Sequence, residues 1–312
     1  MLHKRLKFAG ETAYTPQAAI DILLKMYGVA RKDVGLPEKP ESPKKKAVQT
    51  SMKSFFAPKT NNNKTTATAV QADHNCDGRF QFFSFQDMDL IQTYVPNNGM
   101  KEESFQRRRQ WDQDMLDFFQ ARDKILQHAR DTDRLLLWCG DMNVAHDHRD
   151  GTHWERRPSE ELYEWWTDES KCLASSAKKT DPNRSPDDRG MPSFTPAERR
   201  RFANLLQTAN LVDVWRDLHP DGSSRSDLKQ WDRPEWTWRG HLGKGGVRSK
   251  YEGKGQRLDY FLLSPYNKDS IKACDILGYG SQREGLFCGS DHCASVLVLK
   301  KNNNNNKEDE KA

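Results

Sequence analysis

Four short polar clusters follow apolar segments of this sequence, and their residue types suit acid–base hydrolysis. In chain order, the clusters contain Tyr94, Asp141, Asn143, Asp259, Asp291 and His292. Because residues i and i+2 of a β-strand project from the same face, we expect Asp141 and Asn143 to point into one site. Asp259 lies among apolar residues, where a carboxylate is costly without a partner, and an imidazole is a natural partner for it. A carboxylate that holds an imidazole is typical of hydrolytic sites.

Each cluster also has a structural alternative. A Gly-Asp-Met-Asn segment is often a turn in which Asp141 and Asn143 bond to their own backbone. The Ser-Asp-His segment is frequently a loop or a helix cap, and Asp259 alone suits a structural ion pair. The conjunction favours a site, because all four clusters follow apolar strands and three of them contain carboxylates.

The elements that must position these residues follow from the hydrophobic pattern, which predicts an α/β domain between Arg79 and Leu299. Residues 79–95 predict two strands with a turn near Asp87. Residues 102–129 predict a long helix, residues 134–141 a buried strand and residues 196–208 a second helix. Further segments complete the alternation: LVDVW, WTW, RLDYFLL, ACDILGY and CASVLVL.

The parts outside this domain differ in composition. Residues 1–35 are predicted to be a short helical segment, with Thr15 as N-cap and Pro16 as first residue of one helix over 14–34. This segment is either a docking module or a helix left over from something larger. Residues 36–77 are rich in Pro, Lys, Ser, Thr and Asn and are predicted to be a disordered linker. The α/β domain is assigned to residues 78–300, and residues 301–312 are predicted to be a disordered tail.

The linker contains one motif that its polar composition does not explain. Gln49, Met52, Phe55 and Phe56 match the sliding-clamp (PCNA) interaction motif, whose aliphatic and aromatic residues enter a hydrophobic pocket of the clamp. The alternative is a short element that packs back on the domain. The three lysines at 44–46 suit clamp binding, a nuclear import signal or a simple solvated charge run.

Composition sets wider bounds on the chain. Its 312 residues include 50 basic and 45 acidic side chains, and the net charge of +5 fits a polyanionic partner without requiring one. The mean hydropathy is -0.96, and no apolar run reaches transmembrane length, so we expect a soluble, monomeric protein that does not enter a membrane. The six cysteines form no Cys-x-x-Cys pair, which predicts reduced thiols of an intracellular protein. The basic residues of the linker predict a nuclear location.

Five motifs between Arg79 and Leu299 resemble the successive motifs of the exonuclease III/AP endonuclease family, within the endonuclease/exonuclease/phosphatase superfamily. They are YVPNNG, GDMNVAH, SFTPAERRRF, RLDYFLLS and GSDHC. The resemblance implies a two-sheet α/β sandwich of the DNase I-like type. It also implies a DNA-repair phosphodiesterase that cuts the backbone 5′ to abasic sites, with additional 3′–5′ exonuclease activity. The implied cofactor is Mg²⁺, with Mn²⁺ as an alternative.

The resemblance also implies catalytic roles for individual residues. Asp141 would orient or deprotonate the attacking water, and Asn143 would hold that water and the phosphate. His292, oriented by Asp259, would bind the scissile phosphate and stabilise the pentacovalent transition state. Tyr94 would contact the phosphate or the leaving oxygen.

Metal-binding and DNA-binding roles are implied in the same way. Asn97 would contact the DNA backbone, and Trp236 and Trp238 would wall a pocket for a flipped-out abasic sugar, although a core position is an equal alternative for both. The implied metal-binding residues are Asp141, Asn143, Asp291 and His292.

One departure from the family limits these expectations. Family members begin with a strand that ends in Asn and continue to a Gln-Glu motif whose Glu is a principal Mg²⁺ ligand. Neither motif precedes Arg79, so we expect an incomplete first sheet with an exposed apolar face and edge. Weak or absent activity is then expected, as for a truncated gene model or a non-catalytic clamp- and DNA-binding relative. Another superfamily hydrolase, such as a phosphatase, is a third alternative, and the insertion at 155–190 receives no role.

Overall fold

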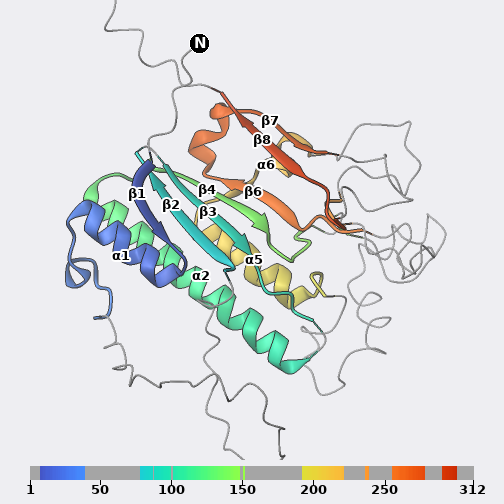
Figure 1. The fold of residues 1–312 in the computed structure, drawn as a ribbon, viewed down its shortest axis with the longest axis horizontal. Helices are drawn as coiled ribbons and strands as arrows, with labels where there is room; N and C mark the ends of the chain where they lie inside the picture. The colour runs from blue at the N-terminus through green and yellow to red at the C-terminus, as the bar shows by residue number, and fades with distance from the viewer. Residues whose placement is uncertain are drawn as a thin grey trace, which may run out of the picture.

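The larger of the two β-sheets in the described residues (Figure 1) carries three of the residues singled out above: Tyr94, Asp141 and Asp259. The structure is a computed structural model that describes residues 8–38, 78–86, 88–99, 101–147, 150–151, 192–220, 236–238, 255–277 and 290–300. The larger sheet has six strands in the order β1 (Phe8–Ala13), β2 (Phe80–Phe85), β3 (Met88–Tyr94), β4 (Leu135–Asp141), β6 (Asp259–Leu263) and β5 (Val212–Asp213). The smaller sheet pairs β7 (Ile271–Ile276) with β8 (Ser295–Leu299). Two sheets with helices confirm the predicted α/β fold class.

Strand directions in the larger sheet are mixed. β3 and β4 run parallel, while β1, β2 and β3 are successively antiparallel, as are β4, β6 and β5. A parallel pair needs a crossover connection, and α2 (Glu102–Ala129) supplies it. The predicted helix over residues 102–129 is therefore confirmed at both ends.

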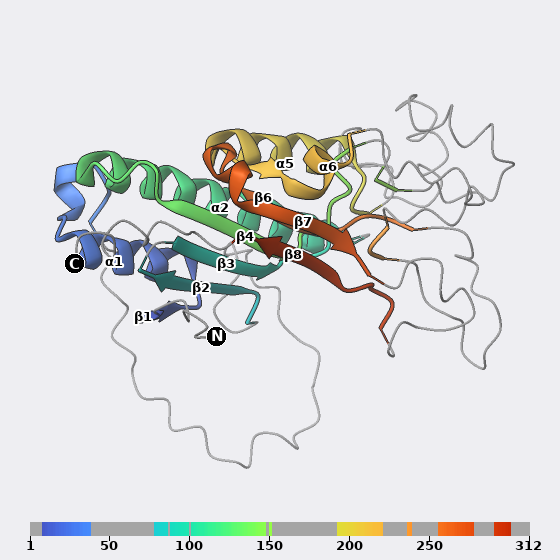
Figure 2. The same cartoon turned by 90° about the horizontal axis from the view of Figure 1, so that it is seen from above.

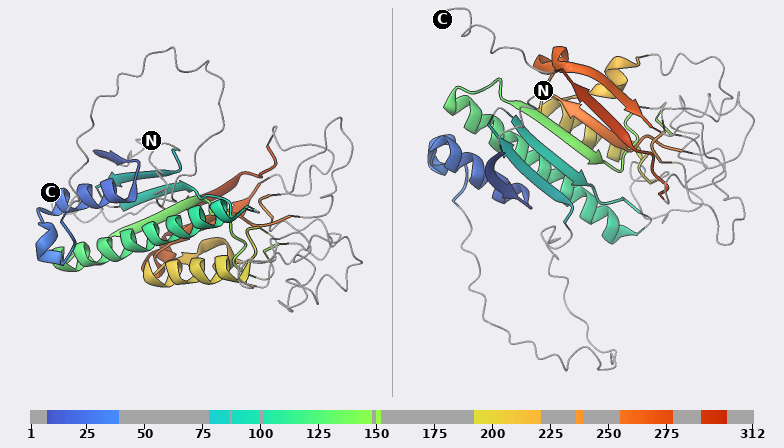
Figure 3. Two further views of the ribbon diagram at one scale, coloured as in Figure 1. Left: turned by 90° about the horizontal axis from the view of Figure 1, so that it is seen from below. Right: turned by 45° about the horizontal axis from the view of Figure 1, so that its top comes forward.

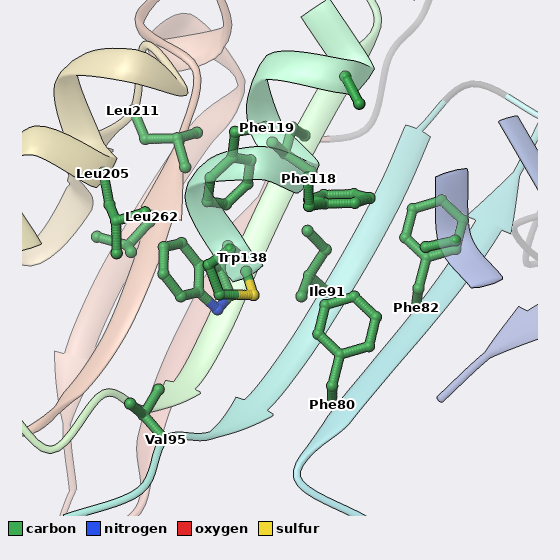
Figure 4. Packing of buried hydrophobic residues seen from close by; sticks show 14 of the residues in the cluster. Phe80, Phe82, Ile91, Val95, Phe118, Phe119, Trp138, Leu205, Leu211 and Leu262 are labelled. Carbon is green, nitrogen blue, oxygen red and sulfur yellow. The ribbon is translucent and has the colours of Figure 1, made fainter. Parts of the chain in front are cut away.

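Three helices cover one face of the larger sheet: α1 (Pro16–Tyr27), α2 and α5 (Pro196–Thr208) (Figure 3). They enclose the main core, in which Phe118 of α2 makes edge contacts with Phe80 and Phe82 of β2 (Figure 4). Trp138 of β4 lies in the same core beside Phe119. Aromatic burial on this scale gives the sheet a rigid support beneath the strand ends.

The smaller sheet lies against the other face of the larger sheet (Figure 2). Val214 and Trp215 of α6 (Val214–Leu218) belong to the same hydrophobic cluster. Leu137 of β4 and Leu263 of β6 pack there against Trp215 and Ile271. Within the described residues β8 pairs with β7 alone, and its Val298 is 39% exposed. The expected incomplete first sheet with an exposed apolar face and edge stays a prediction.

The N-terminal segment belongs to this domain. Thr15 caps α1 by accepting a hydrogen bond from the Ala18 amide at 3.0 Å, as predicted. The single helix predicted over 14–34 is wrong, because Gly28 adopts a left-handed φ of 65° that ends α1, and a 3-10 turn, η1 (Arg31–Val34), follows. Strand β1 was not predicted at all, and it extends the larger sheet by pairing with β2.

Two other predictions need adjustment or lie beyond the described residues. The LVDVW segment divides into β5 and α6, since its Asp213 side chain caps a short helix. The clamp motif, most of the linker, the 155–190 insertion and the C-terminal tail lie outside the described ranges. Among the described residues, Cys139 and Cys274 are thiols outside any disulfide, as expected. Among the described helices, none has the length and apolarity needed to cross a membrane.

Candidate active site at the strand ends

Three of the predicted residues form one row across neighbouring strands. Tyr94 lies opposite Asp141 in the pairing of β3 with β4, and Asp141 lies opposite Asp259 in the pairing of β4 with β6. Directly opposed residues in a sheet place their side chains on the same face and within reach of each other. Ile91 and Trp138 of these strands face the helices, so the row occupies the opposite face.

His292 reaches this row from the second sheet. It lies just before β8, and its Nδ1 is 2.8 Å from Oδ2 of Asp259. Both side chains remain partly accessible, at 28% for His292 and 22% for Asp259. Burial opposes a charge on the imidazole, but the hydrogen bond to Asp259 and the nearby carboxylates outweigh it and raise the pKa of His292 to about 9. The ring is therefore cationic at neutral pH, and the predicted pairing of the two residues is present.

The Asp141 carboxyl is shifted toward neutrality. Burial and the negative charge of Asp259 raise the pKa of Asp141 to about 7, against the opposing effect of His292. A carboxylate that titrates near neutral pH is suited to exchange a proton with water. Near pH 7, therefore, the Asp141 carboxyl exchanges between its neutral and its anionic form, while the His292 ring stays cationic.

Asn143 joins the site through a turn. Strand β4 ends at Asp141, and Asn143 has a left-handed φ of 46°. Its backbone amide donates to Oδ1 of Asp141 at 2.8 Å, and its Nδ2 lies 3.2 Å from the other carboxylate oxygen. The two residues meet as predicted, but through the turn that was stated as the alternative, in which Asp141 bonds the backbone, and not through strand alternation. Asn97 completes the group by donating from Nδ2 to Oδ1 of Asn143 at 3.0 Å.

Glycine at position 140 lets β4 deliver Asp141 to this place. Gly140 has φ 129°, and a Cβ there would lie 2.0 Å from the carbonyl oxygen of Thr93. We expect Gly140→Ala to lower the free energy of unfolding by about 2–5 kcal/mol, measured by urea denaturation, because strain and overlap add. Gly28→Ala is the control, since Gly28 has a positive φ but open space, and it should cost only about 1 kcal/mol. Equal losses of unfolding free energy in the two variants would contradict the close approach of Gly140 to the Thr93 carbonyl oxygen.

The loop that carries Asn97 is held by an arginine that sequence reasoning missed. Arg108 of α2 is 1% exposed, and its Nη1 donates to the carbonyl oxygens of Pro96 at 3.2 Å and Asn143 at 3.1 Å. Its Nε donates to Asp112 at 2.9 Å. The helical i,i+4 spacing of Arg108 and Asp112 is the signal that could have identified this buried pair.

The SFTPAERRRF segment has a structural function in the site. Thr195 caps α5 by accepting from the Glu198 amide at 3.2 Å, and Glu198 accepts from the Thr195 amide at 3.2 Å. This reciprocal capping box also engages the amide of Ser193 at 3.3 Å. The Ser193 hydroxyl accepts from Asn97 at 3.3 Å, so the start of α5 supports the loop beside the row.

The two tryptophans occupy different positions. Trp236 is 4% exposed, and its ring packs so closely on Gly255 that a Cβ there would lie 2.6 Å from it. This burial favours the core alternative for Trp236. Trp238 is only partly buried, and its Nε1 donates to Oδ2 of Asp291 at 3.0 Å. The DNA-contacting roles of Asn97 and both tryptophans stay predictions.

The exposed end of the row is Tyr94, which is 54% accessible. The guanidinium of Arg79 lies 4.6 Å from the centre of its ring and donates to its carbonyl oxygen at 3.2 Å. A cation over the aromatic face restrains the ring and adds positive charge beside it. Tyr94 therefore presents its hydroxyl from a supported position next to Asp141.

The donor atoms in the site suit a hard divalent cation only in part. Carboxylate and amide oxygens of Asp141, Asn143 and Asp291 are the type that Mg²⁺ prefers. Within the described residues, however, no three His, Cys, Asp or Glu side chains gather closely enough to hold a metal ion. The site thus offers suitable donors but no closed cage in that part of the chain.

Comparisons with known proteins agree with the motifs. A family model described as the endonuclease/exonuclease/phosphatase family matches residues 57–292. A DNA-(apurinic or apyrimidinic site) endonuclease of Arabidopsis thaliana is 35% identical over 232 residues, which are 74% of this chain and 53% of the relative. The protein of the same name from Plasmodium falciparum (isolate 3D7) is 29% identical over 233 residues, 73% of this chain and 33% of the relative.

A solved AP endonuclease from Leishmania major aligns with a TM-score of 0.46 at 20% identity, covering 72% of this chain and 55% of that one. The chain spans about half the length of the Arabidopsis relative and a third of the Plasmodium one, at 53% and 33%. The family model includes the whole row and its histidine, from Tyr94 to His292. The chain therefore belongs to the endonuclease/exonuclease/phosphatase family, in the exonuclease III/AP endonuclease branch of its relatives.

Proposed function

We propose that this chain hydrolyses the DNA backbone 5′ to abasic sites, with a secondary 3′–5′ exonuclease activity. The observation that carries the proposal is the pairing of Asp259 with His292 at 2.8 Å, directly across the sheet from Asp141. The Arabidopsis and Plasmodium relatives, which are named DNA-(apurinic or apyrimidinic site) endonucleases, supply the substrate class. Because the chain spans only part of those relatives, their activity is a proposal for this chain.

Each residue of the row has a step that it can perform. Asp141, with a pKa of about 7, accepts a proton from the attacking water. His292, cationic up to a pKa of about 9, offers charge and an N–H to a phosphate oxygen as negative charge develops there. Asn143 and Asn97 provide amide groups on the same side, and Tyr94 offers its hydroxyl to the phosphate or the leaving oxygen.

A divalent cation, Mg²⁺ or alternatively Mn²⁺, is the cofactor proposed for this reaction. When bound, such an ion supplies positive charge to the phosphate and the leaving oxygen. The oxygens of Asp141, Asn143 and Asp291 are the donors that we assign to it. Since the described residues hold no three-ligand group, we expect a requirement for high cation concentration and a low rate.

A second candidate is a protein of this family that binds DNA without cutting it, and the same lack of a three-ligand group in the described ranges favours it. The two candidates separate in a single experiment. The purified chain is incubated with a duplex that contains one abasic site, under titration with Mg²⁺ and Mn²⁺, and binding and incision are measured on the same samples. Incision that EDTA abolishes supports the enzyme, whereas saturable binding without incision supports the second candidate.

Clamp binding is proposed as a separate property of the linker. Gln49, Met52, Phe55 and Phe56 lie outside the described residues, and the proposal rests on the spacing of the motif. A peptide of residues 44–60 is expected to bind a eukaryotic sliding clamp in calorimetric titration, because both phenylalanines fill an apolar pocket. Changing Phe55 and Phe56 to Ala should weaken binding at least about 10-fold. Equal affinity of the two peptides would show that the motif does not bind the clamp. Nuclear location through the lysines at 44–46 is a separate proposal, tested by imaging the protein in cells.

A further inference from the structure

The Asp259–His292 pair joins two sheets that share no strand pairing within the described residues. Asp259 begins β6, which pairs with β4 and β5, whereas His292 precedes β8, which pairs with β7. Their 2.8 Å separation must therefore be set by something other than a common β-ladder. A shift of about 1 Å between catalytic groups is enough to lower a rate about 10²-fold, so this spacing has consequences.

The three residues 236–238 lie between the two halves of the pair. Trp238 and Gln256 exchange backbone hydrogen bonds at 2.8 and 2.9 Å, which ties the segment to the residues that lead into β6. On the other side, the Cys293 amide donates to the carbonyl oxygen of Thr237 at 2.6 Å, and Trp238 forms a β-bridge with His292. The segment thus acts as a short strand that spans the gap between the sheets.

The side chain of Thr237 adds a second connection. It is completely buried, and its Oγ1 accepts hydrogen bonds from the amides of Leu258 at 2.9 Å and Asp259 at 3.1 Å. One residue therefore holds the backbone of Asp259 through its hydroxyl and the backbone beside His292 through its carbonyl. A buried acceptor with two donors restrains the start of β6, because neither amide has water as a substitute.

We propose that Thr237 is a positioning residue that sets the spacing between Asp259 and His292. The proposal deepens the proposed function, on which its kinetic consequences rest, but the geometry of the pair can be measured without activity. The group that matters in this proposal is the Thr237 hydroxyl. Val has nearly the same shape as Thr and lacks the acceptor, whereas Ser keeps the acceptor and lacks the methyl group, so the two variants separate the contributions of these groups.

The test compares Thr237→Val with Thr237→Ser in the full chain. On an abasic-site duplex, Thr237→Val is expected to lower kcat about 10²-fold with little change in KM, and Thr237→Ser to restore most of kcat. A downfield proton NMR signal of the His292 Nδ1–H···Asp259 bond, assigned by its loss in His292→Gln, should persist with Ser and shift or vanish with Val. If Val fails to fold, Thr237→Ala removes the same acceptor and replaces it in both measurements.

The outcomes are distinguishable from failure of the proposed function. If the wild-type chain does not incise the duplex, the proposed activity is wrong. The NMR comparison alone then tests the positioning role of Thr237. An unchanged signal in the variant that lacks the hydroxyl overturns the inference. So does an equal loss of the signal with Ser and Val, because the methyl group and not the acceptor would then be responsible.

Discussion

Replacing Asp259 with Asn is expected to lower kcat for abasic-site incision by about 10²- to 10⁴-fold, because the variant keeps the size of the side chain but removes its charge. His292 then loses the partner at 2.8 Å that keeps its imidazole protonated and oriented. Kinetics under saturating substrate measure the loss. A kcat within about threefold of the wild type would show that the pair does not take part in the reaction.

The same substitution has a defined pH dependence. The folded-state pKa of His292 is raised from 6.5 to about 9, so its contribution to stability is complete below 6.5 and is lost as the pH rises through 9. Asp259→Asn should remove most of this dependence, and the alkaline limb of the rate profile should move to lower pH. Thermal unfolding between those pH values checks the first point, and the rate profile checks the second.

The second large effect is expected at Asp150, which joins the turn after β4 to the residues before β6. Asp150 is fully buried and accepts from Nε and Nη2 of Arg257 at 2.9 and 2.8 Å, with Arg216 as a further partner. Asp150→Asn removes one of the two carboxylates that neutralise the buried Arg257 guanidinium and leaves Asp213 as its remaining counter-ion. We expect the free energy of unfolding to fall by about 3–5 kcal/mol in urea denaturation.

An exposed ion pair provides the matched control. Asp217 pairs with Lys268 at 2.5 Å, with side chains 36% and 39% exposed, so Asp217→Asn should cost less than about 1 kcal/mol. Burial acts to raise the pKa of Asp150, but Arg257 and Arg216 hold it below its ordinary 3.8. Its stabilising effect is therefore present above 3.8 and is lost as the pH falls through the folded-state pKa. Similar losses for both variants would contradict the buried network.

The sequence predicted the parts of the site that local pattern determines. The apolar run before Asp141 and the 3.6-residue periodicity over 102–129 are properties of neighbouring residues, and both elements are present. Asp259, a carboxylate among apolar residues, was expected to need a partner, and the resemblance to the exonuclease III/AP endonuclease family implied that this partner is His292. Chemistry of this kind can be inferred before any three-dimensional arrangement is known.

Features that depend on distant contacts were missed. Strand β1 exists because it pairs with β2, about seventy residues further along the chain, and its own sequence carries no clear alternation. Thr237 binds backbone amides, which have no signature in residue type, and the spacing of Arg108 and Asp112 indicates a pair but not the carbonyl oxygens that Arg108 binds. Asn143 lies beside Asp141 as expected, but in the turn that was stated as the alternative, because spacing alone does not distinguish a left-handed turn from strand continuation.

The central claim is that the row from Tyr94 to Asp259, with His292, cleaves a phosphodiester beside an abasic site. It is tested most directly by mapping the product from a 5′-labelled duplex that carries a single tetrahydrofuran abasic site, with wild type and His292→Ala in parallel. The account predicts a cation-dependent product with a 3′-hydroxyl at the nucleotide 5′ to the site, and at least about a 10²-fold slower reaction for the variant. Incision at the same rate by both proteins, or no incision by the wild type at any Mg²⁺ or Mn²⁺ concentration, would contradict it.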